Sequence, residues 1–444
     1  MKFNGERLPK LVCVCLLVFL VCSCPQLGST HEDARGGRVA GSILQGWMGA
    51  RYSEMNLWET ELRAMRAMGM NCLLLQDPPE PPVFVDCLKA ARKTGIKLIV
   101  GLSSDTGEYA SGGSDDVDLA RIDEDIVQAK KTLTSMAEQV GALSLADGFD
   151  YGKTIYGWYF NQEFHNSRKF YESFLLESSG PESTGPESAG PEFAGDPDVT
   201  GFSYTYILAN HLNLYIEAIG EASYVNQKGR KISLNRPLVF SPFFVVGERD
   251  FTCDVSEYEG FLHGMFGRVN FRPEDIMMPQ DGFGGNTGSV EDRMLLTPET
   301  MALWFGAHQR AAQHRGIRLW INNELFEYDL DGVNGENGLD GGNGVNGGNG
   351  VDGEDEVDGE DGRGGEVGKD EGDVIRLTAT FVERFVENYN LTDKYAEAHM
   401  VFSWNHYYDP LLVSAGLLRG RELPGYNPEA FDEAFRRFVL GEAD

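Results

Sequence analysis

Positive charge is scarce in this sequence. Its 444 residues hold 38 Lys and Arg against 69 Asp and Glu, which gives a formal net charge of −31. Nucleic-acid binding depends on clustered basic side chains that neutralise phosphates, so the composition argues against a nucleic-acid partner. Much of the negative charge is local, because the segment 329–373 is dense in Asp and Glu. The rest of the chain is mildly acidic, which suits a neutral substrate better than an anionic one.

Cysteine is also scarce once the N-terminal segment is set aside. Four of the seven cysteines lie within the first 24 residues, which leaves Cys72, Cys87 and Cys253. An odd number without the spacing of metal ligands excludes a disulfide-based scaffold and predicts no metal site. Cys72 lies in an apolar segment, where a buried thiol acts as a small hydrophobic side chain.

The apolar run Leu11–Val21 is too short to span a bilayer. It follows three basic residues, and together they predict an export signal within residues 1–30. The run ends in a bacterial lipobox-like sequence in which Cys24 would be lipidated. Cys22 is a rival for that role, and a plain secretory signal cut near Ser29 is the alternative. We expect an exported protein: a lipoprotein anchored to the membrane or cell surface, otherwise a secreted or periplasmic protein. A lipid anchor is then the membrane contact that we expect.

From residue 38 onward, an apolar run followed by an amphipathic segment recurs eight times. Most runs are continuous, as is typical of parallel strands covered on both faces. The predicted strands are Arg38–Gly46, Asn71–Gln76, Lys97–Ser104, Thr154–Glu163, Pro237–Phe244, Asp275–Gly282, Arg318–Phe326 and Ala398–Tyr408. The predicted helices are Leu57–Met68, Pro82–Lys93, Asp123–Val140, Tyr204–Ile219, Ser256–Phe266, Glu299–Arg315, Val374–Asn390 and Leu411–Leu418. This order predicts an α/β fold, a (β/α)8 TIM barrel over residues 38–420. A doubly wound sheet is the alternative, but the first strand lacks the Gly-rich turn that such a sheet uses.

Two low-complexity inserts interrupt the pattern, at residues 177–199 and 329–373. The first contains a five-residue repeat, and the second has glycine at nearly every third position without proline. A collagen triple helix is therefore not supported. Both inserts are predicted to be disordered, because they hold too few apolar residues to form a core. The second insert also lacks the residue spacing of a calcium-binding loop.

The chemistry of such barrels lies at the carboxyl ends of the strands. These ends hold no lysine for a Schiff base and no His-x-His pair for zinc, so we predict no cofactor or metal. They are rich in amides, carboxylates and aromatic rings, a set that is typical of a carbohydrate-binding cleft. The predicted binding residues are Gln45, Trp47, Gln76, Trp158, Asn161, Gln280, Asn323, Trp404, Asn405, His406 and Tyr407.

Two glutamates close the predicted fourth and seventh strands. Glycoside hydrolysis needs two carboxyl groups on either side of the scissile bond, and Glu163 and Glu324 fit this need. Their placement is similar to that in a large clan of barrel glycosidases. That clan usually has Asn directly before the first Glu, whereas here Gln162 separates Asn161 from Glu163. Asp281 is a third candidate, although its Asp-Gly sequence fits a turn equally well.

Six short segments form a set that points to one family. They are Gly41-Ser-Ile-Leu-Gln45, Met68-Gly-Met-Asn-Cys-Leu-Leu-Leu-Gln76, Gly157-Trp-Tyr, Pro279-Gln-Asp-Gly282, Trp320-Ile-Asn-Asn-Glu-Leu-Phe326 and Phe402-Ser-Trp-Asn-His-Tyr-Tyr408. Together they resemble a bacterial family known as domain of unknown function 4434, which is regarded as glycosidase-like. The resemblance covers nearly all of residues 38–418 apart from the inserts. It implies a barrel and a carbohydrate context, and no proven reaction.

The sequence therefore predicts a retaining glycoside hydrolase with Glu163 as acid/base and Glu324 as nucleophile. A non-catalytic surface lipoprotein that binds glycans through the same aromatic cleft is the alternative. A different hydrolase or lyase centred on Asp281 is the third hypothesis. The relative orientation of the three carboxyl groups distinguishes them. In the leading hypothesis Trp404 forms a wall of the cleft, and Asn161 lies within hydrogen-bond reach of it.

Overall fold

The computed structural model describes residues 38–103, 119–162, 164–166, 168, 171–172, 175, 204–246, 252–282, 296–325, 327–328, 375–376, 380–407 and 428–442. The N-terminal segment with Cys24 and both predicted inserts lie outside these residues. None of the helices in the described part of the chain is long and apolar enough to cross a membrane.

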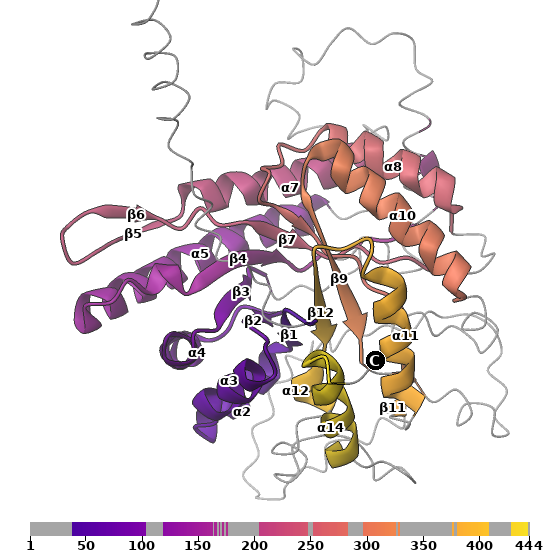
Figure 1. The fold of residues 1–444 in the computed structure, drawn as a ribbon. Coiled ribbons are helices and arrows are strands. Elements are labelled where there is room, and N and C mark those ends of the chain that lie inside the picture. Colours follow the sequence, from indigo (N-terminus) through magenta and orange to yellow (C-terminus); the bar gives the residue numbers. More distant parts are fainter. Residues whose placement is uncertain are drawn as a thin grey trace, which may run out of the picture. The chain divides into compact units, whose positions relative to one another are not determined.

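Eight parallel strands form a closed barrel in which each strand pairs with two neighbours (Figure 1). In order around the barrel the strands are β1 (Gly41–Leu44), β2 (Cys72–Leu75), β3 (Lys97–Gly101), β4 (Ile155–Phe160), β7 (Leu238–Phe240), β8 (Ile276–Met277), β9 (Arg318–Glu324) and β12 (Ala398–Phe402). Each of them falls within a predicted range. The structure thus confirms the α/β prediction of a (β/α)8 barrel.

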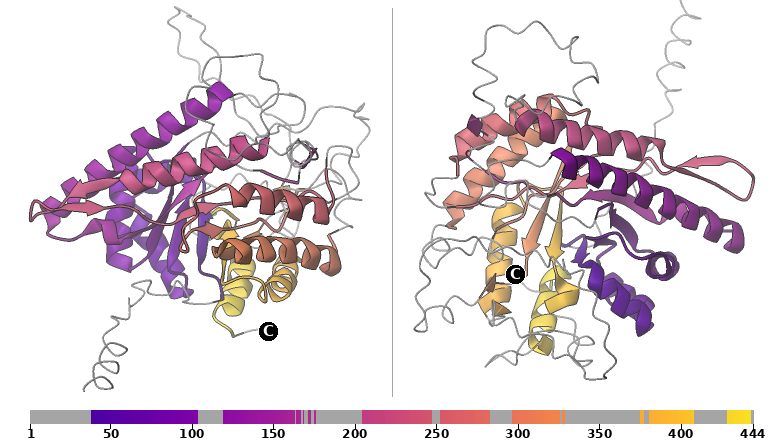
Figure 2. Two further views of the ribbon diagram at one scale, coloured as in Figure 1. Left: turned by 90° about the horizontal axis from the view of Figure 1, so that it is seen from above. Right: turned by 180° about the vertical axis from the view of Figure 1, so that it is seen from behind.

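Helices follow the strands and surround the barrel (Figure 2). Those that overlap predicted helices are α3 (Trp58–Ala67), α4 (Pro81–Thr94), α5 (Leu119–Asp147), α7 (Tyr204–Glu221), α8 (Val255–Gly267), α10 (Pro298–Arg315) and α11 (Thr380–Thr392). Local sequence sets their ends. Asp254 and Glu257 form a capping box at the start of α8. Gly316 ends α10 with a φ of 66°, a left-handed conformation that glycine adopts at little cost.

Eight further helices or strands among the described residues were not predicted. They are α2 (Gly46–Glu54), the short helix η1 (Tyr151–Lys153), the hairpin strands β5 (Ser223–Val225) and β6 (Lys231–Ser233), the strands β10 (Glu327–Tyr328) and β11 (Ile375–Arg376), and the helices α12 (Trp404–Tyr407) and α14 (Pro428–Val439). Two of them correct a prediction, since β11 lies where a helix was predicted and α12 where the eighth strand was predicted to continue. Helix α14 lies beyond residue 420, yet it packs against α11, and its Val439 carbonyl accepts a hydrogen bond from Arg38 N–H. The barrel domain therefore extends past the predicted boundary. The predicted helix Leu411–Leu418 lies outside the described residues.

The second insert begins and ends at a two-stranded antiparallel ladder. Strand β10 (Glu327–Tyr328) pairs with β11 (Ile375–Arg376), and Tyr328 is opposite Ile375. Residues 328 and 375 therefore lie side by side, although 46 residues separate them in the sequence.

This pairing makes the insert removable. Deleting residues 331–372 leaves 329–330 and 373–374 as a four-residue connection, a common hairpin length. We expect the melting temperature of the deletion variant to stay within about 2–4 °C of the parent, because shortening a loop lowers its closure entropy only slightly. Differential scanning calorimetry of both proteins measures this. A larger drop would show that the insert contributes packing.

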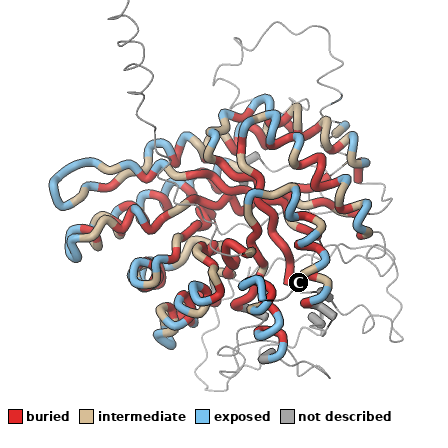
Figure 3. Tube along the Cα trace, viewed as in Figure 1, coloured by how far each residue is buried: buried red, intermediate tan, exposed pale blue. Residues whose placement is uncertain are grey.

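Apolar side chains fill two layers, one inside the barrel and one between strands and helices. Successive residues of a strand point to opposite sides. On β2, Leu73 and Leu75 join a large buried cluster with Phe84 of α4, which we name the outer apolar layer. Cys72 and Leu74 are equally buried but lie outside this cluster, so they face the barrel interior. Figure 3 shows the result: burial is concentrated along the strands and the inner sides of the helices.

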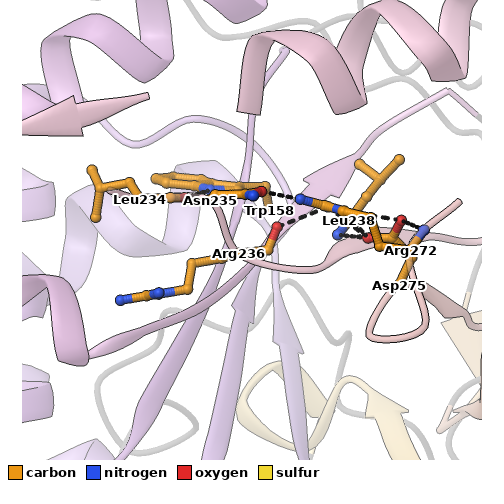
Figure 4. A network of polar contacts seen from close by, with 7 residues as sticks. All are labelled: Trp158, Leu234, Asn235, Arg236, Leu238, Arg272 and Asp275. Carbon is orange, nitrogen blue, oxygen red and sulfur yellow. Dashed lines mark hydrogen bonds and ion pairs between the residues drawn. The ribbon is translucent and has the colours of Figure 1, made fainter. Parts of the chain in front are cut away.

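The amino-terminal ends of β7 and β8 are joined by the buried Asp275, which also pairs with the part-buried Arg272 (Figure 4). Asp275, fully buried, accepts hydrogen bonds from Leu238 N–H at 2.8 Å and from the Arg272 guanidinium at 2.6 Å. Arg272 also donates to the Arg236 carbonyl at 3.0 Å. These contacts lie at the end of the barrel opposite the strand carboxyl ends, where conserved polar groups of such barrels serve stability.

His308 of α10 lies in the outer layer as a neutral imidazole. Its Nδ1–H donates to the Trp304 carbonyl at 2.9 Å, and its Nε2 accepts from the Tyr258 hydroxyl at 3.3 Å. Burial lowers the pKa of His308 to about 4. An unfolded histidine has a pKa near 6.5. Below pH 6.5 the unfolded chain therefore binds a proton that the folded chain does not. The free energy of unfolding thus decreases as the pH is lowered from 6.5.

We expect His308 to contribute about 3 kcal/mol of stability above pH 6.5 that disappears as the pH approaches 4. Urea unfolding at pH 7, 5.5 and 4.5 measures this for the parent and for His308→Gln. The variant should lose less stability on acidification, since it lacks the titrating group. Parallel pH dependences of the two proteins would contradict the assignment.

Candidate active site

Strand β9 carries a buried glutamate at its carboxyl end. Ile321 belongs to the outer apolar layer. Alternation along the strand therefore turns Trp320, Asn322 and Glu324 toward the barrel interior. The Trp320 ring stacks on Tyr156 of β4 with centroids 5.6 Å apart, and since β4 and β9 are not neighbours this contact crosses the interior. Only 4 % of Glu324 is exposed.

Asp281 follows β8 and contacts the end of β9. One carboxylate oxygen accepts the Glu324 backbone N–H at 3.2 Å. The other accepts the Asn323 side-chain amide at 3.3 Å and the amide of Asn388, on α11, at 3.4 Å. Asp281 also donates its own N–H to the Asn322 carbonyl at 2.9 Å. Its carboxylate is therefore between the strands and α11, where it supports β9.

Asn323 shares this outward position. Its Oδ1 accepts a hydrogen bond from His399 Nδ1 of β12 at 2.8 Å, which requires the tautomer with the proton on Nδ1. Burial lowers the pKa of His399, and the Asp393 carboxylate, 3.6 Å from its Nε2, opposes this shift. Asn322, one residue earlier, faces the interior, and its Oδ1 is buried without a hydrogen-bond partner among the described residues. The structure thus places Asn322 in the interior, whereas the sequence selected Asn323.

The end of β4 contributes Asn161 to the interior. Phe160 belongs to the outer layer, so Asn161 points inward, and its Nδ2 donates to the Gln76 carbonyl beyond β2. The Oδ1 of Asn161 is buried with no partner in the described part of the chain. Gly101 permits this contact, because a Cβ there would lie 2.0 Å from the Gln76 oxygen. Two residues that the sequence selected, Gln76 and Asn161, are therefore in contact.

A buried polar cluster lies behind the same strand end. Asp125 of α5 accepts hydrogen bonds from His211 Nε2 at 2.8 Å and from the Tyr215 hydroxyl at 2.7 Å, both on α7. Its other oxygen accepts the Gln162 amide at 3.5 Å. Gln162 thus points away from the interior and ties the end of β4 to two helices. This cluster matches the one around Asp281: in each, an amide side chain at a strand end contacts a buried aspartate.

Comparison with known proteins identifies the family. The sequence model of the domain of unknown function DUF4434 matches residues 76–337, which is more than half of the chain. The chain belongs to the DUF4434 family. No curated protein matches it in sequence.

Solved structures resemble this DUF4434 chain only distantly. A protein from Bacteroides thetaiotaomicron that is assigned as an alpha-L-fucosidase has a TM-score of 0.46 at 13 % identity, over 93 % of this chain and 98 % of that one. An endocellulase from Pyrococcus horikoshii, solved with cellotetraose, has a TM-score of 0.40 at 12 % identity, over 91 % and 92 % of the two chains. The catalytic domain of a beta-amylase from Paenibacillus polymyxa has a TM-score of 0.39 at 9 % identity, over 91 % and 100 %.

Three predicted binding residues of the DUF4434 chain contact the helix layer instead of the interior. Trp158 is fully buried in the outer layer, and its Nε1 donates to the Leu234 carbonyl at 3.0 Å. Trp404 is also fully buried, and its Nε1 donates to Asp432 of α14 at 2.8 Å. The Asn405 amide donates to buried Glu61 of α3 at 2.9 Å. These contacts give all three side chains a structural role, so Trp404 does not form the expected wall.

The remaining selected residues differ in how far the structure describes them. Gln45 and Gln280 are half-buried, and Gln280 forms a parallel bridge with Asn322, which extends the β8–β9 pairing. Glu163 and Cys24 lie outside the described residues. The side chains of three more residues are not described, although their backbones lie in α2 and in α12 (Trp404–Tyr407): Trp47, His406 and Tyr407. Among the described residues, no group of three His, Cys, Asp or Glu side chains could hold a metal ion.

Sequence reasoning missed Asn322, Asn388, His399 and Asp125. One signal was present for Asp125, because a charged residue lies on the apolar side of an amphipathic helix. Asn388 and His399 gave no such signal, since their roles arise from contacts between residues 76 or more positions apart.

Proposed function

We propose that this DUF4434 protein is a retaining glycoside hydrolase in which Glu324 is the nucleophile and Glu163 the acid/base. The placement of Glu324 carries the proposal: a buried carboxylate on the interior face of β9, at the barrel end where such folds perform chemistry. Asp281, the competing carboxylate, accepts hydrogen bonds from β9 and α11. This contact pattern favours Glu324 over Asp281 as the reacting group.

The two glutamates would act in two steps. First, the Glu324 carboxylate attacks the anomeric carbon while Glu163 protonates the departing glycosidic oxygen, which forms a covalent glycosyl ester. Then Glu163 takes a proton from water, and the water oxygen displaces Glu324 from the anomeric carbon. Retention requires the two carboxyl groups to lie about 5–5.5 Å apart. Neither step needs a metal or an organic cofactor.

The interior amides fit a neutral sugar. Asn161 and Asn322 have side-chain oxygens without partners among the described residues, and Gln280 lies beside Asn322. An amide presents both donors and acceptors, which matches hydroxyl groups that can donate and accept. The proposed substrate is therefore an uncharged carbohydrate that is held by amides at the ends of β4, β8 and β9.

A hydrolysis screen tests the function. The chain without residues 1–30 would be incubated with a panel of neutral oligosaccharides and polysaccharides, and released reducing ends would be quantified. We expect at least one glycan to be cleaved. Binding of a glycan by calorimetry without any cleavage would contradict hydrolysis and favour the glycan-binding alternative.

We also propose that the protein is exported and anchored by lipid at Cys24, from the lipobox-like sequence alone. In a bacterial host, Cys24→Ala should move the protein from the membrane fraction to the soluble fraction, as measured by immunoblotting. Cys22→Ala is the matched control and should leave the protein with the membrane. The reverse pattern would assign Cys22, and no change in either variant would favour a plain signal.

A further inference from the structure

Strand β8 has a buried aspartate at each end, and the two have different partners. Asp275, before the strand, pairs with the Arg272 guanidinium at 2.6 Å and lies at the amino-terminal end of the barrel. Asp281, after the strand, accepts hydrogen bonds from the Glu324 N–H and from two asparagine amides. Both are at most 1 % exposed. The two residues therefore form a natural pair for comparison.

Asp281, Arg384 and His399 together hold the last two residues of β9. The N–H of Glu324 donates to Asp281 at 3.2 Å, and its carbonyl accepts from Arg384 of α11 at 3.2 Å. The preceding Asn323 is held by Asp281 at 3.3 Å and by His399 at 2.8 Å. The backbone on both sides of the Glu324 Cα is thus fixed to neighbouring elements.

Fixing this backbone limits the positions that the side chain can reach. The Glu324 carboxyl group lies only two carbon atoms beyond its Cα, so a change in the backbone at the end of β9 moves or rotates the carboxyl group. Catalytic groups must stay within about 0.5 Å of their working position. A displacement of about 1 Å can cost about 100-fold in rate. Burying a carboxylate is itself costly, so a buried Asp281 is expected to have a role beyond filling space.

The geometry points to Asp281 as a positioning residue for Glu324: its carboxylate clamps the last two residues of β9 and so aims the Glu324 carboxylate into the interior. Asp281 itself does not touch substrate. This assignment rests on the proposed role of Glu324 as nucleophile and adds that the residue depends on a carboxylate from the neighbouring strand. It also re-assigns a residue that the sequence offers as a catalytic candidate.

Two variants of the full-length chain test the clamp. Asp281→Asn keeps the size of the side chain but replaces one carboxylate oxygen with an NH2 group. An NH2 group cannot accept hydrogen bonds from the Glu324 N–H or from the asparagine amides, so part of the clamp is lost. Asp275→Asn is the matched control, since it weakens an equally buried carboxylate at the other end of the same strand. We expect Asp281→Asn to lower kcat about 100-fold with KM changed less than about threefold. Asp275→Asn should destabilise the fold but leave kcat within about threefold at a temperature where it is folded.

A second measurement does not depend on activity. Hydrogen–deuterium exchange followed by mass spectrometry reports the protection of the Glu324 amide in the peptide that covers the end of β9. Asp281→Asn should raise its exchange rate at least tenfold, about 1.4 kcal/mol, and Asp275→Asn should not. Unchanged exchange in Asp281→Asn overturns the clamp, as does a kcat loss no larger than that of the control. If Asp281→Asn does not fold, Asp281→Glu, which keeps the charge, replaces it with the same expectations. The two proposals can fail separately. If Asp281→Asn raises the exchange rate of the Glu324 amide but Glu324→Gln is fully active, then the proposed function is wrong, while Asp281 still holds the end of β9.

Discussion

Replacing Glu324 with Gln should lower kcat by about 10³-fold or more on any glycan that the protein cleaves. Gln has the same shape as Glu, and the contacts of residue 324 to Asp281 and Arg384 are made by its backbone. The fold should therefore survive while the nucleophile is lost. Initial rates, together with the melting temperature of the variant, measure both effects.

Glu397→Gln is the control for this result. Glu397 precedes β12, lies at the opposite end of the barrel and pairs with Arg318 at 2.7 Å. The substitution removes the same functional group from a place where no substrate is expected, so the rate should be unchanged. Equal rate losses in both variants, or full activity of Glu324→Gln, would remove Glu324 from the mechanism.

Trp158→Ala should destabilise the protein by about 3–5 kcal/mol. The side chain is fully buried in the outer apolar layer and donates to the Leu234 carbonyl, so its removal leaves a cavity and an unpaired buried carbonyl. Urea unfolding with a constant m-value gives the free energy. KM should stay unchanged at a temperature where the variant is folded, because Trp158 does not face the interior.

Trp158→Phe separates packing from hydrogen bonding. The smaller ring keeps most of the apolar contact and loses only the donor, so the cost should be about 1–2 kcal/mol. If both Trp158 variants keep nearly full stability and raise KM, then the tryptophan binds substrate as the sequence suggested, and its assignment to the core is wrong.

The barrel strands could be predicted from the sequence because burial on both faces requires a recognisable run of apolar residues. A parallel strand that is covered on both faces is a short apolar run, and eight such runs between amphipathic segments allow few other folds. Even β8, with two residues, lies within its predicted range. Helix α14 escaped prediction because it follows the eighth repeat, where the pattern no longer requires a helix.

The direction of each side chain could not be predicted from the same pattern. A strand that is apolar on both faces shows no alternation, so neighbouring residues such as Asn322 and Asn323 are equivalent in the sequence. A shift of one residue exchanges the interior for the helix layer. The same ambiguity explains Trp158, which was selected for the cleft and packs under the helices.

The supporting clusters were beyond sequence reasoning for a different reason. Asp281 is hydrogen-bonded to Asn388, which is 107 positions away in the sequence, and Asp125 to Tyr215, which is 90 positions away. Such contacts depend on how α5, α7 and α11 pack on the barrel. Aspartate at a strand end looks the same whether it reacts with substrate or holds a backbone, and only its partners separate the two roles.

Covalent trapping tests the central claim most directly. An activated 2-deoxy-2-fluoro analogue of the cleaved sugar slows the second step of a retaining hydrolase, so the glycosyl ester accumulates. Peptide mapping by mass spectrometry then identifies the modified residue. Glu324 as nucleophile predicts one adduct, on the peptide that contains Glu324, and none in Glu324→Gln. An adduct on Glu163 or Asp281, or turnover of a glycan with inversion at the anomeric carbon, would contradict the proposed mechanism.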